Sequence, residues 1–556
     1  MSEHYLTKVW YKNPYFYIVL GILIIYGFNL FIDVMDVDAA QYASISMEMS
    51  KSGSYLEVYH RGADYLDKPP LLFWLSSLSM SVFGIGNFAY KFPSFLLAIL
   101  GIYSTYRFAL LFYSKKTAVF AGIILATTQA LFLITNDVRT DTNLLAFVIF
   151  SAWQLTVYLR TNQWKHLILG FIGVGGAMLA KGPIGIISVV VALGFDFLVQ
   201  KQWKYIFKWQ WLIGILIVAV ILAPMTYGLY HQFDLHPEKT AYEIKSPSGV
   251  KFYYWTQSFG RITGESSWNN GSPPFFFVHS ILWDFQPWIL YLILGLIATV
   301  KSFFTKRKDG ETREYITFGG FVLVFIALSL SKYKLPHYIF VTFPFAAIIA
   351  AKYLAQLEVG KKWVQGIQIF FNSLFWIIIG FGLIFLFPPD NILLPIVLVA
   401  LFIASWVVFF KQKVVSNRLF FSTILTILGF NLMLASHFYP TLINGYQGSA
   451  QIGKIVHEKG LTDKEFFYFD VHEHSLDFYS QMITQGKQLH ELVDLPEGTW
   501  IYTNDESFEK IKAAKIPFKV VEEFDDFTVT QLKLPFLFPS TREETLTKVY
   551  ILERVR

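Results

Sequence analysis

Carboxylates and a lysine recur in one polar segment that separates two apolar stretches near the N-terminus. In chain order its polar groups are Asp33, Asp36, Asp38, Gln41, Tyr42, Asp67 and Lys68. A carboxylate can accept a proton from an attacking hydroxyl group. Lys68 stands before Pro69-Pro70, which can open a helix, and a lysine at a helix start is unfavourable unless an anion binds there. The segment 33–70 therefore predicts a catalytic loop, with Asp38 and Asp67 as its catalytic carboxylates and Lys68 as a phosphate ligand.

A structural interpretation competes with this one. Asp38 precedes a helical pattern that stops at Gly53, so its side chain could simply cap that helix. Asp33 and Asp36 could be solvated carboxylates at a membrane surface. The second acidic group, Asp67, and the lysine beside it favour chemistry.

Composition sets the class of protein. Of 556 residues, 54% are hydrophobic and only 15% are charged, which is typical of a helical protein that crosses a membrane many times. The chain contains no cysteine, so disulfides, a thiolate nucleophile and cysteine metal sites are excluded.

Basic residues lie in short loops at alternate ends of the apolar stretches, which indicates the cytoplasmic side. Lys8 and Lys12 favour a cytoplasmic N-terminus, so the loop 33–70 faces outward. The segment 71–83 is predicted to lie along the interface, because counting it as a crossing would put Lys115 and Lys116 outside. Thirteen spans result: 14–32, 88–113, 117–135, 142–160, 164–180, 184–200, 210–230, 280–300, 315–331, 338–356, 364–387, 391–410 and 419–437.

The chain changes character after Phe438. β-like runs at 466–470, 499–503 and 519–533 alternate with polar segments. We predict a membrane domain over 1–438, with outer loops 33–70 and 231–279, and a soluble α/β domain over 439–556 on the outer face. No catalytic cluster is evident in this second domain, so recognition or structural support is expected of it.

Further charged and aromatic groups fall at the same membrane end as the loop. They are Arg139, Asp141, Lys181, Arg261, Lys334 and Tyr338. Charges beside hydrocarbon are costly and usually paired or functional. Any single lysine or arginine could instead reach the headgroups by snorkelling. Four of the residues could together bind a phosphodiester: Lys68, Arg261, Lys334 and Tyr338.

These residues fall into motifs that resemble a known family. The motifs are Asp38-Ala-Ala-Gln-Tyr42-Ala, Tyr65-Leu-Asp67-Lys68-Pro-Pro, Arg139-Thr-Asp141, Ala180-Lys181-Gly-Pro183 and Lys332-Tyr-Lys-Leu-Pro-His-Tyr338. In this order they resemble the bacterial aminoarabinose transferase and protein mannosyltransferase group of GT-C glycosyltransferases. The chain departs from the family's first motif, Asp-Glu-x-Arg-Tyr-Ala, at Ala39 and Gln41, and it has Asp67 where the family usually has Glu.

The resemblance implies a thirteen-span fold with an outer α/β domain in the bacterial inner membrane. It implies inverting transfer of one sugar from an undecaprenyl phosphate carrier to an acceptor at the outer leaflet. Asp38 would be the general base, while Tyr42, Arg139, Asp141 and Lys181 would contact substrates. Lipid A, another glycolipid, a polysaccharide and a protein all remain open as acceptors. No cofactor is required, although there is room for a divalent cation, and no nucleic-acid partner is expected.

Two other classes remain. A transporter or flippase of lipid-linked saccharides would also show many spans and embedded charges, but it would be expected to show paired halves with charges at mid-membrane. A noncatalytic component of surface assembly or polymer export would explain the C-terminal domain but not the carboxylate loop.

Overall fold

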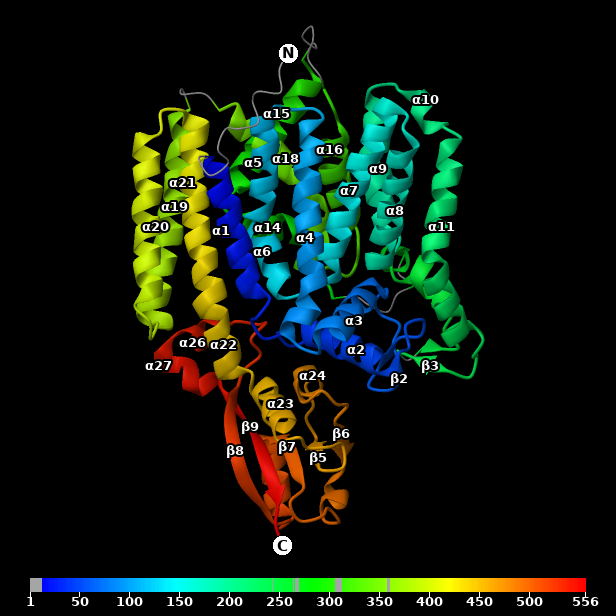
Figure 1. Ribbon diagram of the computed structural model, residues 1–556, viewed down its shortest axis with the longest axis vertical. Helices are drawn as coiled ribbons and strands as arrows, with labels where there is room; N and C mark the ends of the chain where they lie inside the picture. Colours follow the sequence, from blue (N-terminus) through cyan, green and yellow to red (C-terminus); the bar gives the residue numbers. More distant parts are fainter. Residues whose placement is uncertain (1–12, 243, 264, 266–269, 306–312, 358–360) are drawn as a thin grey trace.

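A bundle of helices forms one part of the molecule, and a small sheet domain projects from one end of it (Figure 1). The computed structural model describes residues 13–242, 244–263, 265, 270–305, 313–357 and 361–556, and for Arg261 and Ile262 it describes the backbone alone. Lys8 and Lys12, used above to orient the chain, lie outside the described residues.

The predicted apolar stretches are largely helical, although 117–135 and 280–300 are each divided between two of the helices. The helices of the bundle are α1 (Pro14–Asn29), α2 (Asp38–Ser52), α3 (Leu71–Phe83), α4 (Asn87–Leu110), α5 (Lys115–Ala126), α6 (Gln129–Asn136), α7 (Thr140–Thr161), α8 (Trp164–Lys181), α9 (Ile184–Val199), α10 (Trp203–Ile206), α11 (Gln210–Leu229), α12 (Gly249–Lys251), α13 (Gly260–Thr263), α14 (Phe276–Asp284), α15 (Ile289–Phe303), α16 (Ile316–Phe318), α17 (Val324–Ser329), α18 (Phe343–Ala355), α19 (Lys362–Phe381), α20 (Leu393–Lys411), α21 (Val415–Met433) and α22 (Tyr439–Tyr446). A 3₁₀ segment, η5 (Pro336–Thr342), leads into α18.

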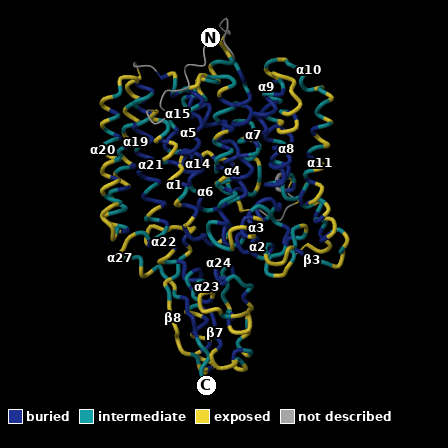
Figure 2. Tube along the Cα trace, viewed as in Figure 1, coloured by how far each residue is buried: buried dark blue, intermediate teal, exposed yellow. Residues whose placement is uncertain are grey.

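Seven helices of the described chain are long and apolar enough to cross a membrane, or eight if the bent pair α5–α6 is one span. Five shorter apolar segments accompany them: α1, α3, α9, α15 and the stretch Ile316–Ser329. The protein is thus a multi-pass helical membrane protein. The bundle interior is buried, whereas outer helices such as α20 expose much of their surface (Figure 2).

Helices α7 and α8 pack unusually closely, and the start of α7 and the end of α8 lie beside the candidate site. Three glycines of α8 face α7, and a Cβ built on Gly170 would lie 2.5 Å from a side-chain carbon of Leu155. Gly173 and Gly176 meet Ser151 and Phe147 in the same way. Because small residues let helices approach closely, this stripe holds the start of α7 beside the end of α8.

Two two-stranded hairpins belong to the loops predicted to face outward. β1 (Tyr59–His60) pairs with β2 (Ala63–Asp64), and β3 (Thr240–Ala241) pairs with β4 (Ile244–Lys245). The first hairpin and α2 lie within the predicted catalytic loop, and α3 lies beside α2 at the end of the bundle (Figure 1).

The C-terminal domain is a mixed α/β structure. Its strands run in the order β6-β5-β7-β9-β8, with β5 parallel to β6 and β7, and β9 antiparallel to β7 and β8. The strands are β5 (Phe466–Phe469), β6 (Gln485–Lys487), β7 (Trp500–Asn504), β8 (Phe518–Asp526) and β9 (Thr547–Arg554), and the helices are α23 (Gly448–Glu458), α24 (His474–Ser480), α25 (Asp505–Ala513), α26 (Leu534–Leu537) and α27 (Pro539–Arg542).

The strand predicted over 519–533 ends earlier than expected, at Asp526. Directly afterwards the backbone of Phe527 donates a hydrogen bond to the Tyr446 carbonyl, 2.8 Å away, and the ring of Phe527 stacks on that of Phe536. Phe536 is buried in the hydrophobic cluster that also fills the bundle. The chain therefore leaves the sheet to pack against the helices.

Candidate active site

Asp38 is the first residue of α2 and faces a cation. Val37 occupies the cap position and makes no side-chain capping bond, so Asp38 does not cap the helix. Arg139, just before α7, donates from Nη1 to the Asp38 carboxylate and from Nε and Nη2 to Asp137 Oδ2, at 2.9 and 2.7 Å. The Asp38 side chain is still 43% exposed. A carboxylate held by an arginine and open on its other side can receive a proton or orient a substrate.

Tyr42 joins the two predicted catalytic carboxylates. Burial raises the pKa of its hydroxyl, the charge of Asp38 raises it further, Arg139 lowers it, and Asp67 raises it again. The charges of both carboxylates therefore act on this hydroxyl group. Asp67 Oδ2 accepts a hydrogen bond from Lys68 Nζ at 2.6 Å, whereas its buried Oδ1 has no hydrogen-bond partner among the described residues. That oxygen can accept a bond from a substrate hydroxyl.

Asp141 and Lys181 form a second pair where α7 and α8 meet. Lys181 Nζ donates to Asp141 Oδ1, and its ammonium group also lies 4.0 Å from the centre of the Tyr338 ring. His337 Nε2 lies 3.8 Å from the other carboxylate oxygen. The start of α7 thus contacts both parts of the site, Asp38 through Arg139 and Lys181 through Asp141.

A cavity of about 130 Å³ lies beside part of this arrangement. Lys68, Lys181 and Tyr338 supply its charged and aromatic side, together with Gln257 and Ser258. The remaining lining is largely apolar: Leu144, Ile184, Ile187, Phe259, Ala327 and Leu328. A ligand with an anionic head and a hydrocarbon tail matches such a cavity.

Of the two remaining predicted phosphate ligands, Lys334 stands apart from this arrangement, whereas the side chain of Arg261 is not described. Lys334 is 3% exposed and donates from Nζ to the Ser272 carbonyl at 3.1 Å, and its backbone is bonded on both sides by Asn270. It is not among the residues that line the cavity. Arg261 lies in α13, but its side chain is outside the described part of the chain.

Comparison with known proteins shows what this chain resembles. Residues 67–227 match the family model described as dolichyl-phosphate-mannose-protein mannosyltransferase. The chain is 23% identical over 357 residues to the undecaprenyl phosphate-alpha-4-amino-4-deoxy-L-arabinose arabinosyl transferase of Edwardsiella ictaluri, a match that covers 62% of this chain but only 59% of that transferase. An uncharacterized protein of Aquifex aeolicus is 26% identical over 63% of this chain and 74% of its own length.

The fold agrees over nearly the whole length. The crystal structure of ArnT from Cupriavidus metallidurans bound to undecaprenyl phosphate superposes with a TM-score of 0.73 over 97% of this chain and 98% of that one, at 17% identity. This chain has the ArnT-like fold. The ArnT-like fold includes both the helical bundle and the C-terminal α/β domain.

Several residues of this site were not predicted from the sequence. Gln257 lines the cavity and also donates from Nε2 to the Asp67 carbonyl, and Ser258 lies beside it. Both precede Arg261 in the motif Ser258-Phe-Gly-Arg261, so closer attention to that motif could have found them. Asp137, whose carboxylate accepts two hydrogen bonds from Arg139, is given no role by the sequence motifs.

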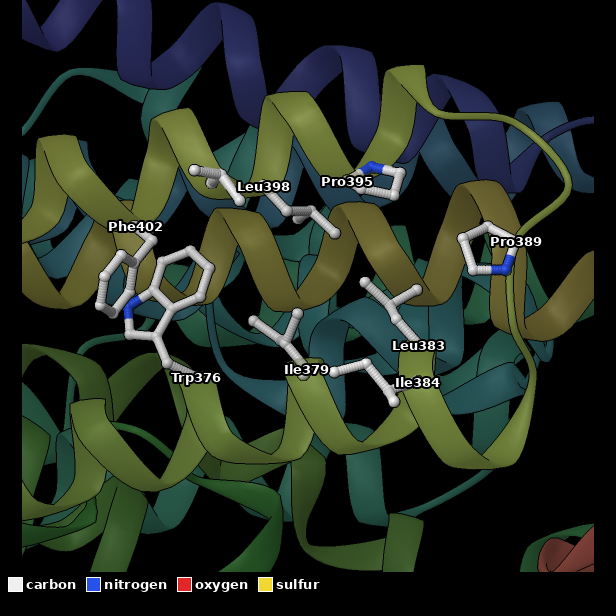
Figure 3. Close-up of a pocket in the computed structure, with 10 residues that line it drawn as sticks. Trp376, Ile379, Leu383, Ile384, Pro389, Pro395, Leu398 and Phe402 are labelled. Atoms are coloured by element: carbon white, nitrogen blue, oxygen red, sulfur yellow. The ribbon is translucent and has the colours of Figure 1, made fainter.

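The ArnT-like bundle has a further hollow that carries no such chemistry. It has a volume of about 340 Å³, lies between α19 and α20, and is lined by apolar and aromatic residues that include Trp376, Leu383, Leu398 and Phe402 (Figure 3). Its lining contains no titratable group. Nor do the described residues contain a group of three or more His, Cys, Asp or Glu side chains arranged to hold a metal ion.

Proposed function

We propose that the protein is an inverting glycosyltransferase that moves one sugar from a polyprenyl phosphate carrier, undecaprenyl phosphate in bacteria, to an acceptor at the outer leaflet. One observation carries the proposal: a cavity has Lys68, from the predicted catalytic loop, with Lys181 and Tyr338 on its polar side and has apolar walls elsewhere. A phosphodiester with a polyprenyl tail has the matching chemistry.

In the proposed reaction an acceptor oxygen attacks the anomeric carbon as the bond to the carrier phosphate oxygen breaks. If the acceptor is a hydroxyl group, its proton passes to Asp38, which Arg139 holds in place. Such base assistance is worth roughly 10²- to 10⁴-fold in rate. If the acceptor is a phosphate, it is already ionised and Asp38 orients it. Attack from the face opposite the carrier inverts the anomeric centre.

The carrier phosphate gains one negative charge as it leaves. Lys68 and Lys181 offset this charge from the cavity wall, and Tyr338 can donate a hydrogen bond. We retain Arg261 as a bidentate phosphate ligand on its residue type alone. Lys334 is assigned a supporting role, because its ammonium group bonds a backbone carbonyl.

Substrate contacts fall to the remaining residues. Asp67 Oδ1, which is buried without a partner among the described residues, suits a sugar hydroxyl. We assign Tyr42, Arg139 and Asp141 to orienting the substrates. At Ala39 and Gln41 this chain lacks the charged residues of the family's first motif, so neither aminoarabinose as the sugar nor lipid A as the acceptor is fixed. Another glycolipid, a polysaccharide or a protein fits equally well as the acceptor. No cofactor is required in this scheme, and it leaves room for a divalent cation.

We further propose thirteen crossings of the bacterial inner membrane. They comprise the eight candidate spans together with α1, α8, α9, α15 and the stretch α16–α17, while α3 lies along the interface. The active site and residues 439–556 then face the periplasm, and residues 1–438 form the membrane domain. The predicted basic loops support this orientation.

The test is transfer by purified protein and its Asp38→Asn variant, each supplied with undecaprenyl phosphate sugars and a membrane lipid extract. We expect an acceptor to gain the mass of one hexose or pentose with the wild type alone. Equal gain with both proteins would remove Asp38 from catalysis. No gain with any carrier, together with protein-dependent movement of lipid-linked saccharide across vesicles, would favour the flippase instead.

A further inference from the structure

The backbone just ahead of Asp38 is held by the C-terminal domain. The Val34 N–H donates to Tyr479 Oη at 2.7 Å, and Gln447 Nε2 donates to the Val34 carbonyl at 2.9 Å. The Asp36 N–H donates to Gln447 Oε1 at 3.0 Å. One amide side chain thus pairs with the backbone on both sides of Met35, as a neighbouring strand would.

The Asp36 side chain adds a buried polar anchor. Its carboxylate accepts hydrogen bonds from the Ser475 N–H at 3.2 Å, from Ser475 Oγ at 2.5 Å and from Ser449 Oγ at 3.3 Å. Asp36 is 8% exposed, and both serines are fully buried. Burial raises the pKa of this carboxyl to about 6, while the serine bonds lower it. A carboxylate is costly to bury unless it is hydrogen-bonded. The bonds from the two serines therefore favour the position in which the loop packs against the C-terminal domain.

The same domain also contacts the loop on either side of these residues. Lys454 of α23 pairs with the Asp33 carboxylate. Beyond α2, the guanidinium group of Arg61, in the β1–β2 turn, pairs with Asp477 of α24 and donates to the Thr484 carbonyl at 2.7 Å. Helix α24 itself packs against α2 (Figure 1). Contacts before and after α2 therefore fix that helix from the domain side.

We propose that the C-terminal domain positions the catalytic loop: Gln447, Ser475 and Asp36 set where Asp38 stands relative to Arg139. This inference rests on the proposed function. Asp38 follows Asp36 by two residues and is otherwise held by Arg139 from the bundle, so the base is fixed between two bodies of the protein. A shift of about 1 Å in a catalytic group can cost about 10²-fold in rate. Gln447, Ser475 and Asp36 are positioning residues, because they act through Asp38.

The experiment uses the full-length protein in detergent with a carrier-linked sugar and acceptor that the wild type turns over. Gln447→Leu removes both amide contacts at nearly constant size. Gln485→Leu, on the exposed strand β6, is the matched control. We expect Gln447→Leu to lower kcat about 10²-fold while the donor KM and the Kd for undecaprenyl phosphate stay within about twofold of wild type, and the control to match wild type.

A second pair of variants distinguishes a loss of positioning from misfolding. Ser475→Ala removes one hydroxyl donor and is expected to lower kcat without changing the donor KM or the Kd for undecaprenyl phosphate. Ser475→Thr keeps that donor and should retain more activity than Ser475→Ala. Unchanged kcat in both Gln447→Leu and Ser475→Ala would overturn the inference, as would a parallel loss of kcat and carrier binding. If the wild type transfers no sugar but still binds the carrier, the proposed function fails, and the inference fails with it. If Gln447→Leu and Ser475→Ala transfer sugar at the wild-type rate, only the inference fails.

Discussion

Replacing Lys181 by methionine is expected to destabilise the protein by about 3–5 kcal/mol, because it leaves a buried carboxylate without its cation. The Asp141 side chain is 2% exposed and, among the ion pairs of the described residues, would keep the one with His337, 3.8 Å away. Asp141→Asn should cost less, about 1–3 kcal/mol, because the Lys181 side chain is 18% exposed and its ammonium group also lies over the Tyr338 ring. The double variant removes both charges and should recover most of the loss.

Thermal unfolding of the four proteins in one detergent measures this coupling. With an unfolding entropy of about 2.1 cal/mol/K per residue, 1 kcal/mol corresponds to about 1 °C for a chain of 556 residues. Lys181→Met should therefore lower the midpoint by about 3–5 °C. Carrier affinity should stay weak in the double variant, since Lys181 lines the cavity. A double variant as unstable as Lys181→Met, or one that binds the carrier normally, would refute the reasoning.

Three further outcomes are expected. Lys68→Ala should weaken donor binding more than Asp38→Asn does, as measured by titration with undecaprenyl phosphate; equal affinities would take Lys68 out of the phosphate site. Burial, with the charges of Asp36 and Asp526, raises the pKa of Glu473 to about 8. Because the folded state then holds a proton that the unfolded state has lost, stability should fall as pH rises from 6.5 to 8, and the thermal midpoint of Glu473→Gln should lack that slope. Transfer should persist in EDTA, and an activity that EDTA removes and Mg²⁺ restores would establish a divalent cation.

Local patterns in the sequence were enough to predict much of the bundle. The interfacial segment 71–83 matches α3 in its bounds, and Gly53 ends α2 with a φ of 71° as expected. Hydrophobic length and the positions of basic residues are local properties, so they can be read without the fold. The pairing of Asp67 with Lys68 is local as well.

The contacts between distant segments could not be predicted. A solvated carboxylate was one of the interpretations left open for Asp36, but Ser475 bonds it in a buried position, and no periodicity links residues so far apart. Lys334 lies in one of the family motifs, yet its backbone N–H donates to Asn270 and its ammonium group donates to the Ser272 carbonyl. A motif gives residue type and order, whereas tertiary packing decides which of its side chains face a cavity.

The hold on the loop also has a consequence for biosynthesis. Gln447 is made 411 residues after Asp36, and Ser475 is made 439 residues after it. Every helix of the bundle up to α22 precedes both residues in the chain. A nascent protein can therefore insert and pack while Asp38 is held by Arg139 but the loop ahead of it is not yet held by the C-terminal domain. The last domain to leave the ribosome would therefore complete the site, and a product that terminates before residue 447 would carry every cavity residue and still be a poor catalyst.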